Sequence, residues 1–328
     1  FRPDLPVTRA EFVKMAVSAL GLETAPVAPG EAWYGNYVNA AVNAGIHKWE
    51  DFTSGDWNTP LTREEMARLA VRAVGEDTDD PLKWMYLATS KGLIQGTDNT
   101  GKLDEKGTTT RAQAVAIIER ILTIRGGGEL KVDKHAVSRA EVLWHRTNVF
   151  TMLPQFFSKV FPGYEWDTSK LVLETPDGKY KAVVDAVLVV DLEDPNDPFL
   201  SELPDLTTMK WNAPGGVRHP VSEYKDSYII YFKNHVEYNL DDDVYANQDS
   251  LDVSVLGFFN DVEKEKAGVL VGAAPLYVND DEFPGFIIPK RVKTQDTIDL
   301  NIYSPSIVPH PTYKTILLRG FSDYYSNE

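Results

Sequence analysis

The sequence contains no cysteine among its 328 residues, so a disulfide framework and a thiolate metal site are both excluded. It also contains no run of about 18 apolar residues, and no segment is therefore predicted to span a membrane. The chain opens inside a repeat and without a signal peptide. We therefore expect that Phe1 is not the biological start of the protein.

Positive charge is scarce. The chain has 33 Lys and Arg against 49 Asp and Glu, which gives a net charge of -16. This balance argues against a nucleic acid partner, because phosphate binding needs clustered cations, whereas an acidic wall polymer or a metal ion fits better. The acidity is uneven: residues 1–128 hold 14 cations against 17 acids, and residues 129–328 hold 19 against 32. Length and a hydrophobic content of 43% allow two or more domains with separate cores.

Catalytic motifs are also missing. The sequence has no G-x-S-x-G elbow, phosphate-binding loop or H-E-x-x-H helix, and its six histidines are scattered. We predict that the protein is not an enzyme. The paired carboxylates of a glycosidase have no fixed spacing in sequence, so a polysaccharide hydrolase remains the alternative.

One pattern occurs three times, as "PVTRAEFVKMAVSALGL", "PLTREEMARLAVRAVG" and "TTTRAQAVAIIERIL". In each, a threonine is predicted to cap a helix, and an acid or amide three residues later completes a capping box. The capping pairs are Thr8 with Glu11, Thr62 with Glu65, and Thr110 with Gln113. Capping does not explain the arginine in between, because a cation in the first turn opposes the helix dipole. Arg9, Arg63 and Arg111 are therefore candidates for binding an anion.

A second repeated block precedes the last two motifs. It reads "YVNAAVNAGI" at residues 37–46 and "WMYLATSKGL" at residues 84–93, each predicted as a helix that ends at a left-handed glycine, Gly45 or Gly92. Each unit is thus a helix, a glycine stop, a polar loop and a capped helix. Of the first unit, the chain contains only the second half.

These motifs resemble S-layer homology (SLH) repeats, the helical modules that hold bacterial surface proteins on the cell wall. The similarity covers residues 1–125 and includes the Thr-Arg-Ala-Glu helix start, a tryptophan and a Gly-Ile pair. It implies three repeats in a pseudo-threefold spindle, whose grooves bind a pyruvylated secondary cell wall polysaccharide. The motif arginines would meet the ketal carboxylates, helped by backbone donors of the helix N-terminus. The implied polysaccharide-binding residues are Arg9, Arg63, Arg111, Trp33, Gly45, Gly92 and Gly96.

The repeats are not identical. The third has Asp80 where alignment on the glycine would place the counterpart of Trp33, and the second has Trp49 where the third has Gly96. We therefore expect the grooves to differ in competence.

The rest of the chain has a different pattern and resembles no family known to us. Residues 126–161 are predicted as a linker at Gly126–Gly128 followed by a helix from Ser138 to about Phe161, which opens with a capping box from Ser138 to Glu141. Residues 162–328 alternate like strands between Pro, Asn, Asp and Gly loops, which predicts a mainly antiparallel, β-sandwich-like, acidic domain. The expected strands are 170–175, 180–191, 228–238, 251–259, 268–278, 286–292, 297–303 and 313–319. The expected fold class is thus multidomain α + β.

Two acidic loops suggest calcium, the one cofactor that the sequence leaves open. The first offers Asp241, Asp243, Asn247 and Asp249, and the second Asp191, Glu193, Asp194 and Asp197. Neither has the glycine and terminal glutamate of an EF-hand, so solvated loop acids are the competing interpretation.

The combined expectation is an extracellular, S-layer-type surface protein. Its repeats would bind the anionic polysaccharide of the wall through several weak grooves that act together. The β domain would assemble with copies of itself in a lattice or be displayed. The alternatives are a wall-anchored hydrolase and a carbohydrate-binding adhesin.

Overall fold

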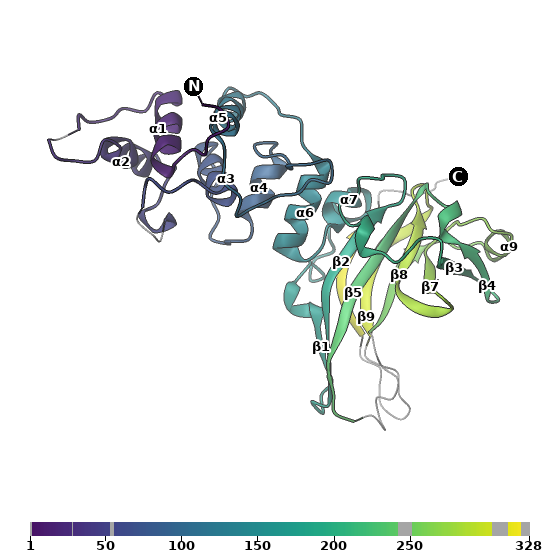
Figure 1. The fold of residues 1–328 in the computed structure, drawn as a ribbon. Coiled ribbons are helices and arrows are strands. Elements are labelled where there is room, and N and C mark those ends of the chain that lie inside the picture. The colour runs from purple at the N-terminus through teal and green to yellow at the C-terminus, as the bar shows by residue number, and fades with distance from the viewer. Residues whose placement is uncertain (1, 28, 53–55, 242–250, 304–313, 323–328) are drawn as a thin grey trace. The chain divides into compact units, whose positions relative to one another are not determined.

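The computed structural model describes residues 2–27, 29–52, 56–241, 251–303 and 314–322. It shows a mixed α+β protein that divides into two compact units, Phe1–Ala140 and Glu141–Glu328 (Figure 1). The division falls inside one helix, and the first unit includes part of the segment that the sequence assigned to a linker. Within the described ranges, every helix is too short or too polar to cross a membrane.

The first unit is helical. Its elements are α1 (Arg9–Ala19), α2 (Gly35–Asn43), the 3-10 turn η1 (Trp49–Asp51), α3 (Arg63–Ala73), α4 (Trp84–Ser90), α5 (Arg111–Arg125) and the start of α6 (Lys134–His145). The three motif helices α1, α3 and α5 begin as predicted, because each N-cap threonine forms the full reciprocal capping box. Each glycine-ended helix packs against the motif helix before it in the chain, α2 on α1 and α4 on α3.

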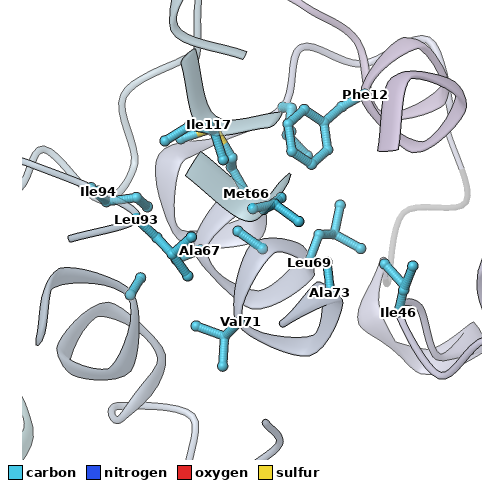
Figure 2. Close-up of a cluster of buried hydrophobic side chains, with 14 of the residues drawn as sticks. Phe12, Ile46, Met66, Ala67, Leu69, Val71, Ala73, Leu93, Ile94 and Ile117 are labelled. Atoms are coloured by element: carbon cyan, nitrogen blue, oxygen red, sulfur yellow. The ribbon is translucent and has the colours of Figure 1, made fainter. Parts of the chain in front are cut away.

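Helix α3 contributes most to the core of this unit. Its buried face is so wide that Met66, Leu69 and Val71 are all at most 1% exposed. Phe12 of α1 and Ile117 of α5 belong to the same buried cluster, as do side chains that follow α2 and α4 (Figure 2). Burial of each large apolar side chain contributes about 1.5–3 kcal/mol, so this shared core holds the repeats together.

The predicted helix from Ser138 to Phe161 is wrong in its extent. Helix α6 begins at Lys134, because the Asp133 carboxylate accepts the N–H of Ala136 at 3.2 Å. It ends at His145, because Arg146 adopts a left-handed conformation with φ of 58°. Two short helices follow, α7 (Val149–Met152) and α8 (Pro154–Phe157).

The predicted capping box at Ser138 is also wrong, since Ser138 is a buried interior residue of α6. Its expected partner Glu141 caps another helix. The Glu141 carboxylate accepts the backbone N–H groups of Phe150 at 3.1 Å and Thr151 at 2.8 Å, in the first turn of α7. Burial raises the pKa of Glu141 to about 7, although these hydrogen bonds lower it.

The second unit contains two antiparallel sheets (Figure 1). A seven-stranded sheet has the order β1-β2-β5-β8-β7-β3-β4, and a three-stranded sheet has the order β10-β9-β6. The strands are β1 (Val172–Glu174), β2 (Tyr180–Asp191), β3 (Met209–Ala213), β4 (Val217–Pro220), β5 (Ser227–Asn239), β6 (Asp252–Phe258), β7 (Ala274–Val278), β8 (Asp281–Pro289), β9 (Thr294–Tyr303) and β10 (Lys314–Phe321). The remaining elements are the 3-10 turns η2 (Thr168–Leu171), η3 (Leu200–Glu202) and η4 (Val221–Glu223) and the helix α9 (Val262–Lys266).

Both faces of the central strands are buried. Successive residues of β2, such as Val187 and Leu188, point to opposite faces of the sheet and belong to two separate apolar clusters. One cluster joins the large sheet to the small sheet and to Phe156 and Phe157 of α8. The other contains Trp211 of β3, a strand that the sequence analysis did not predict.

Candidate functional site

The segments that precede the three motif helices form a closed ring of backbone hydrogen bonds. The Val7 N–H donates to the Thr109 carbonyl at 2.9 Å, the Thr109 N–H to the Leu61 carbonyl at 2.9 Å, and the Leu61 N–H to the Val7 carbonyl at 2.8 Å. Each repeat therefore donates to one neighbour and accepts from the other. The ring fixes the three helix starts around one centre.

The first-turn donors of the motif helices are consumed inside the fold. In α1, the N–H groups of Arg9 and Ala10 donate to the carbonyls of Thr59 at 3.1 Å and Trp57 at 3.0 Å. The same two positions of α3 donate to Gly107 and Glu105, and those of α5 to Leu5 and Pro3. The expectation that these helix N-termini offer free backbone donors to an anion is therefore wrong.

Two motif arginines bind the motif acid of another repeat. Arg9 is 8% exposed and forms an ion pair with Glu65, and its Nη1 donates to the Asp56 carbonyl at 3.2 Å. Its guanidinium also lies 4.5 Å from the ring centroid of Phe52. On the surface, Arg111 Nη1 lies 2.6 Å from Glu11 Oε1.

Arg63 is the exception. In the cyclic order of the other two pairs its partner would be the motif acid of the third repeat, but that position is Gln113. The Arg63 Nε donates to the Leu103 carbonyl and its Nη2 to the Gln95 carbonyl, both at 2.7 Å. Burial lowers the pKa of the Arg63 guanidinium, and nearby acids oppose that shift. The arginines thus join the repeats to each other, which accounts for a cation in the first helical turn.

A row of six aromatic rings lies beside α1, and we call it the aromatic row. It consists of Trp33, Tyr34, Trp57, Phe52, His47 and Trp49. Successive centroids are between 4.9 and 6.2 Å apart, and Tyr34 stacks on Trp57 at 5.6 Å. Its middle is packed into the unit, whereas Trp33 is 46% and Trp49 is 61% exposed at the two ends. Exposed tryptophans that continue a packed aromatic row are typical of binding surfaces.

Lys14 of α1 lies beside the exposed end of this row. Its ammonium is 5.6 Å from the ring centroid of Trp33 and 5.3 Å from that of Tyr37. Lys14 is exposed and forms no ion pair with any acid in the described part of the chain. Lys14 is therefore a cation at this site whose charge remains available to a ligand.

The sequence analysis missed Lys14, although alignment of the repeats contains the signal. The position five residues after the motif arginine is Lys14 in the first motif, Arg68 in the second and Ala116 in the third. Arg68 repeats the cation–aromatic contact, with its guanidinium 6.0 Å from the ring of Trp84. Trp84 is buried, however, and Arg68 also binds Asp51 at 3.4 Å. The three sites are thus chemically different.

A charged cluster supports the inner part of the aromatic row. The Asp51 carboxylate lies 2.5 Å from Arg72 Nη1 and 3.1 Å from His47 Nδ1, and all three side chains are at most 5% exposed. Burial alone would raise the pKa of Asp51, but the adjacent His47 and the hydrogen bonds from the Lys48 N–H and Arg72 hold it well below its usual range. The carboxylate therefore stays ionised and fixes His47 within the row.

The glycines that were predicted to line the grooves have different surroundings. Gly45 and Gly92 both have φ of 71°, but the space beside Gly45 is open. A Cβ on Gly92 would lie 2.9 Å from Leu130 Cβ, and one on Gly96 would lie 2.4 Å from Gly101 Cα. Gly92 and Gly96 thus permit close packing of this chain on itself.

The predicted calcium ligands do not come together in the part of the chain that the structure describes, where no group of three or more His, Asp or Glu could hold a metal. Asp191 and Glu193 each lie 2.7 Å from Lys290 Nζ. Asp241 pairs with Lys179 at 2.6 Å. Asp243, Asn247 and Asp249 lie outside the described residues.

Comparison with protein-family models gave no match, and comparison with curated proteins gave none either. The candidate site therefore rests on its own geometry. It comprises an exposed tryptophan, a tyrosine and a lysine on a frame that backbone hydrogen bonds and ion pairs hold in place.

Proposed function

We propose that the protein is an extracellular surface protein of the S-layer type, which the first unit anchors non-covalently to an anionic, pyruvylated secondary cell wall polysaccharide. The second unit is displayed at the surface or contacts further copies of the protein. The observation that carries this proposal is the group formed by Lys14 of α1, the exposed Trp33 and the half-buried Tyr37.

The chemistry of this group suits a sugar that carries a carboxylate. The apolar face of a sugar ring packs against an exposed aromatic ring, and Lys14 supplies a charge for the carboxylate. The closed ring of backbone hydrogen bonds between Val7, Leu61 and Thr109 supports the pseudo-threefold arrangement that the SLH resemblance implies. In this proposal the motif arginines hold the repeats together, and Lys14 takes the ligand role at the first groove.

The three grooves contribute unequally in this proposal. The first has Lys14 exposed, the second has Arg68 partly neutralised by Asp51, and the third has Ala116. Several weak contacts along one polymer still give firm anchoring, because each bound groove raises the effective concentration at the others. We expect the first groove to supply most of the affinity.

Co-sedimentation of the full chain with purified cell walls tests the proposal. Walls with pyruvylated polysaccharide are compared with the same walls after mild-acid removal of pyruvate, at low and high salt. Lys14→Glu and Trp33→Ala should each weaken binding to native walls about ten-fold. On depyruvylated walls, the wild type should bind no more tightly than these variants do. Lys102→Glu is the matched control, since Lys102 is exposed in the same unit and lies outside the aromatic row.

Two results would contradict the proposal. If the wild type bound native and depyruvylated walls equally, the carboxylate would not be the recognised group. If Lys14→Glu and Lys102→Glu reduced binding by the same factor, the aromatic row and its lysine would not be the site.

A further inference from the structure

The second unit contains a pocket of about 390 Å³, formed by three segments that are distant in sequence. Its lining residues are Phe259, Asn260, Asp261, Lys264, Leu270, Val271, Arg291 and Lys293. The first segment follows β6, the second comprises part of α9 and the residues after it, and the third connects β8 to β9. The volume is in the range of pockets that hold small molecules.

The walls of this pocket are fixed by backbone contacts. The Phe259 N–H donates to the Lys293 carbonyl at 3.1 Å, which joins two of the three segments. The third segment packs so closely that a Cβ on Gly272 would lie 2.8 Å from the Phe259 carbonyl oxygen. The lining side chains are therefore presented by a preformed frame.

The charge of the pocket is opposite to that of its unit. Residues 141–328 hold 16 Lys and Arg against 30 Asp and Glu, yet the pocket lining has three cations and one acid. Most other described cations of this unit lie in ion pairs with acids, such as Lys290 with Asp191 and Arg319 with Asp299. Arg291 and Lys293 form no ion pair within the described residues, and both side chains are exposed. Their charges are available to an anion.

The single acid of the lining is already satisfied. Asp261 Oδ1 accepts the Lys264 N–H at 3.1 Å, and its Oδ2 lies 3.0 Å from the Lys264 ammonium. The rest of the lining is the amide of Asn260 and the apolar or aromatic residues Leu270, Val271 and Phe259, of which Phe259 is 49% exposed. The pocket thus combines a guanidinium and an ammonium with an exposed aromatic ring.

We propose that this pocket binds an acidic saccharide of one or two sugar rings, with the carboxylate held by Arg291 and Lys293 and one ring face packed on Phe259. A guanidinium offers two parallel donors to a carboxylate, and the aromatic ring selects for a sugar over a simple inorganic anion. The pocket size fits a mono- or disaccharide. This site is independent of the first unit and does not rest on the wall-binding proposal.

Isothermal titration of the full chain with digalacturonate tests this inference. The comparison ligands are the methyl ester of digalacturonate, which lacks the charge, and inorganic phosphate, which lacks the ring. We expect saturable binding of digalacturonate in the millimolar range, and binding of either comparison ligand at least about ten-fold weaker. The double variant Arg291→Gln/Lys293→Gln should lose at least about ten-fold in affinity.

Lys225→Gln is the matched control, because Lys225 is exposed in the same unit and does not line the pocket. Phe259→Ser should weaken the binding of digalacturonate without changing the weak binding of phosphate. Unsaturable heats, equal binding of the methyl ester, or full affinity in the double variant would each overturn the inference. To separate this site from the first unit, the titration is repeated with Lys14→Glu, which should leave the affinity of the pocket unchanged.

Discussion

The substitution Glu65→Gln isolates the charge that joins the first two repeats. Glu65 has two roles, since Oε2 accepts the Thr62 N–H at 3.0 Å and the other oxygen pairs with Arg9. Glutamine retains the first role: in the third repeat, Gln113 Oε1 accepts the Thr110 N–H at 2.9 Å. The substitution therefore removes the carboxylate charge and leaves the capping box in place.

The expected loss follows from burial. The side chains of Arg9 and Glu65 are only 10% and 14% exposed, and breaking a buried ion pair by removing one partner costs about 3–5 kcal/mol. Arg9 keeps its carbonyl partner and its aromatic neighbour, so we expect a loss of about 2 kcal/mol in the free energy of unfolding. The control is Glu11→Gln, whose pair with Arg111 is 32% and 36% exposed and should contribute about 0.5 kcal/mol.

Urea unfolding of the full chain, followed by circular dichroism at the helical band, measures both variants by linear extrapolation. The first unit holds most of the helical residues, so this signal reports mainly on it. Equal losses for the two variants, or a loss below 0.5 kcal/mol for Glu65→Gln, would refute the claim that the buried pair joins the repeats.

Two further predictions concern the glycines and the buried acid. Gly45→Ala should cost about 1 kcal/mol of stability for the left-handed backbone alone, whereas Gly92→Ala should cost clearly more because its Cβ would meet Leu130. Thermal unfolding of both variants measures the two losses. Equal losses of stability would contradict the prediction. The pKa of Glu141 is raised to about 7 in the fold, above its ordinary value near 4.5, so the folded state holds this proton more tightly than the unfolded chain does. The stability from this group is therefore fully present below pH 4.5 and decreases by about 3 kcal/mol as the pH rises to about 7. Urea titrations from pH 4 to 8 should show that Glu141→Gln lacks this part of the pH dependence; an unchanged pH profile would mean that Glu141 does not titrate in this range.

The periodic parts of the fold were predictable from the sequence. The starts of α1, α3 and α5 follow from threonine capping boxes, a purely local signal, and the bounds of β2 coincide with the predicted strand. The helix across residues 138–161 was mispredicted because its first break depends on one left-handed residue, Arg146, which no glycine or proline marks, and because the later break signalled by Pro154, the first residue of α8, was not used. The candidate site was only partly predictable. Trp33 was identified, but the neighbourhood of Lys14 depends on contacts between helices, which a local pattern does not contain.

The ring formed by Val7, Leu61 and Thr109 also bears on how the first unit folds during synthesis. Helical proteins usually fold fast because their contacts are local, but this ring joins residues about 100 positions apart. Only the bond between Val7 and Leu61 is possible before Thr109 is translated. At ordinary rates of synthesis the first two repeats therefore wait roughly 2–10 s for the third. Protease resistance of nascent chains arrested before and after residue 109 would measure this delay, and resistance already complete before that point would argue against it. The hydrogen bonds that close the ring in the folded unit thus leave an interval in which the first two repeats lack their third partner.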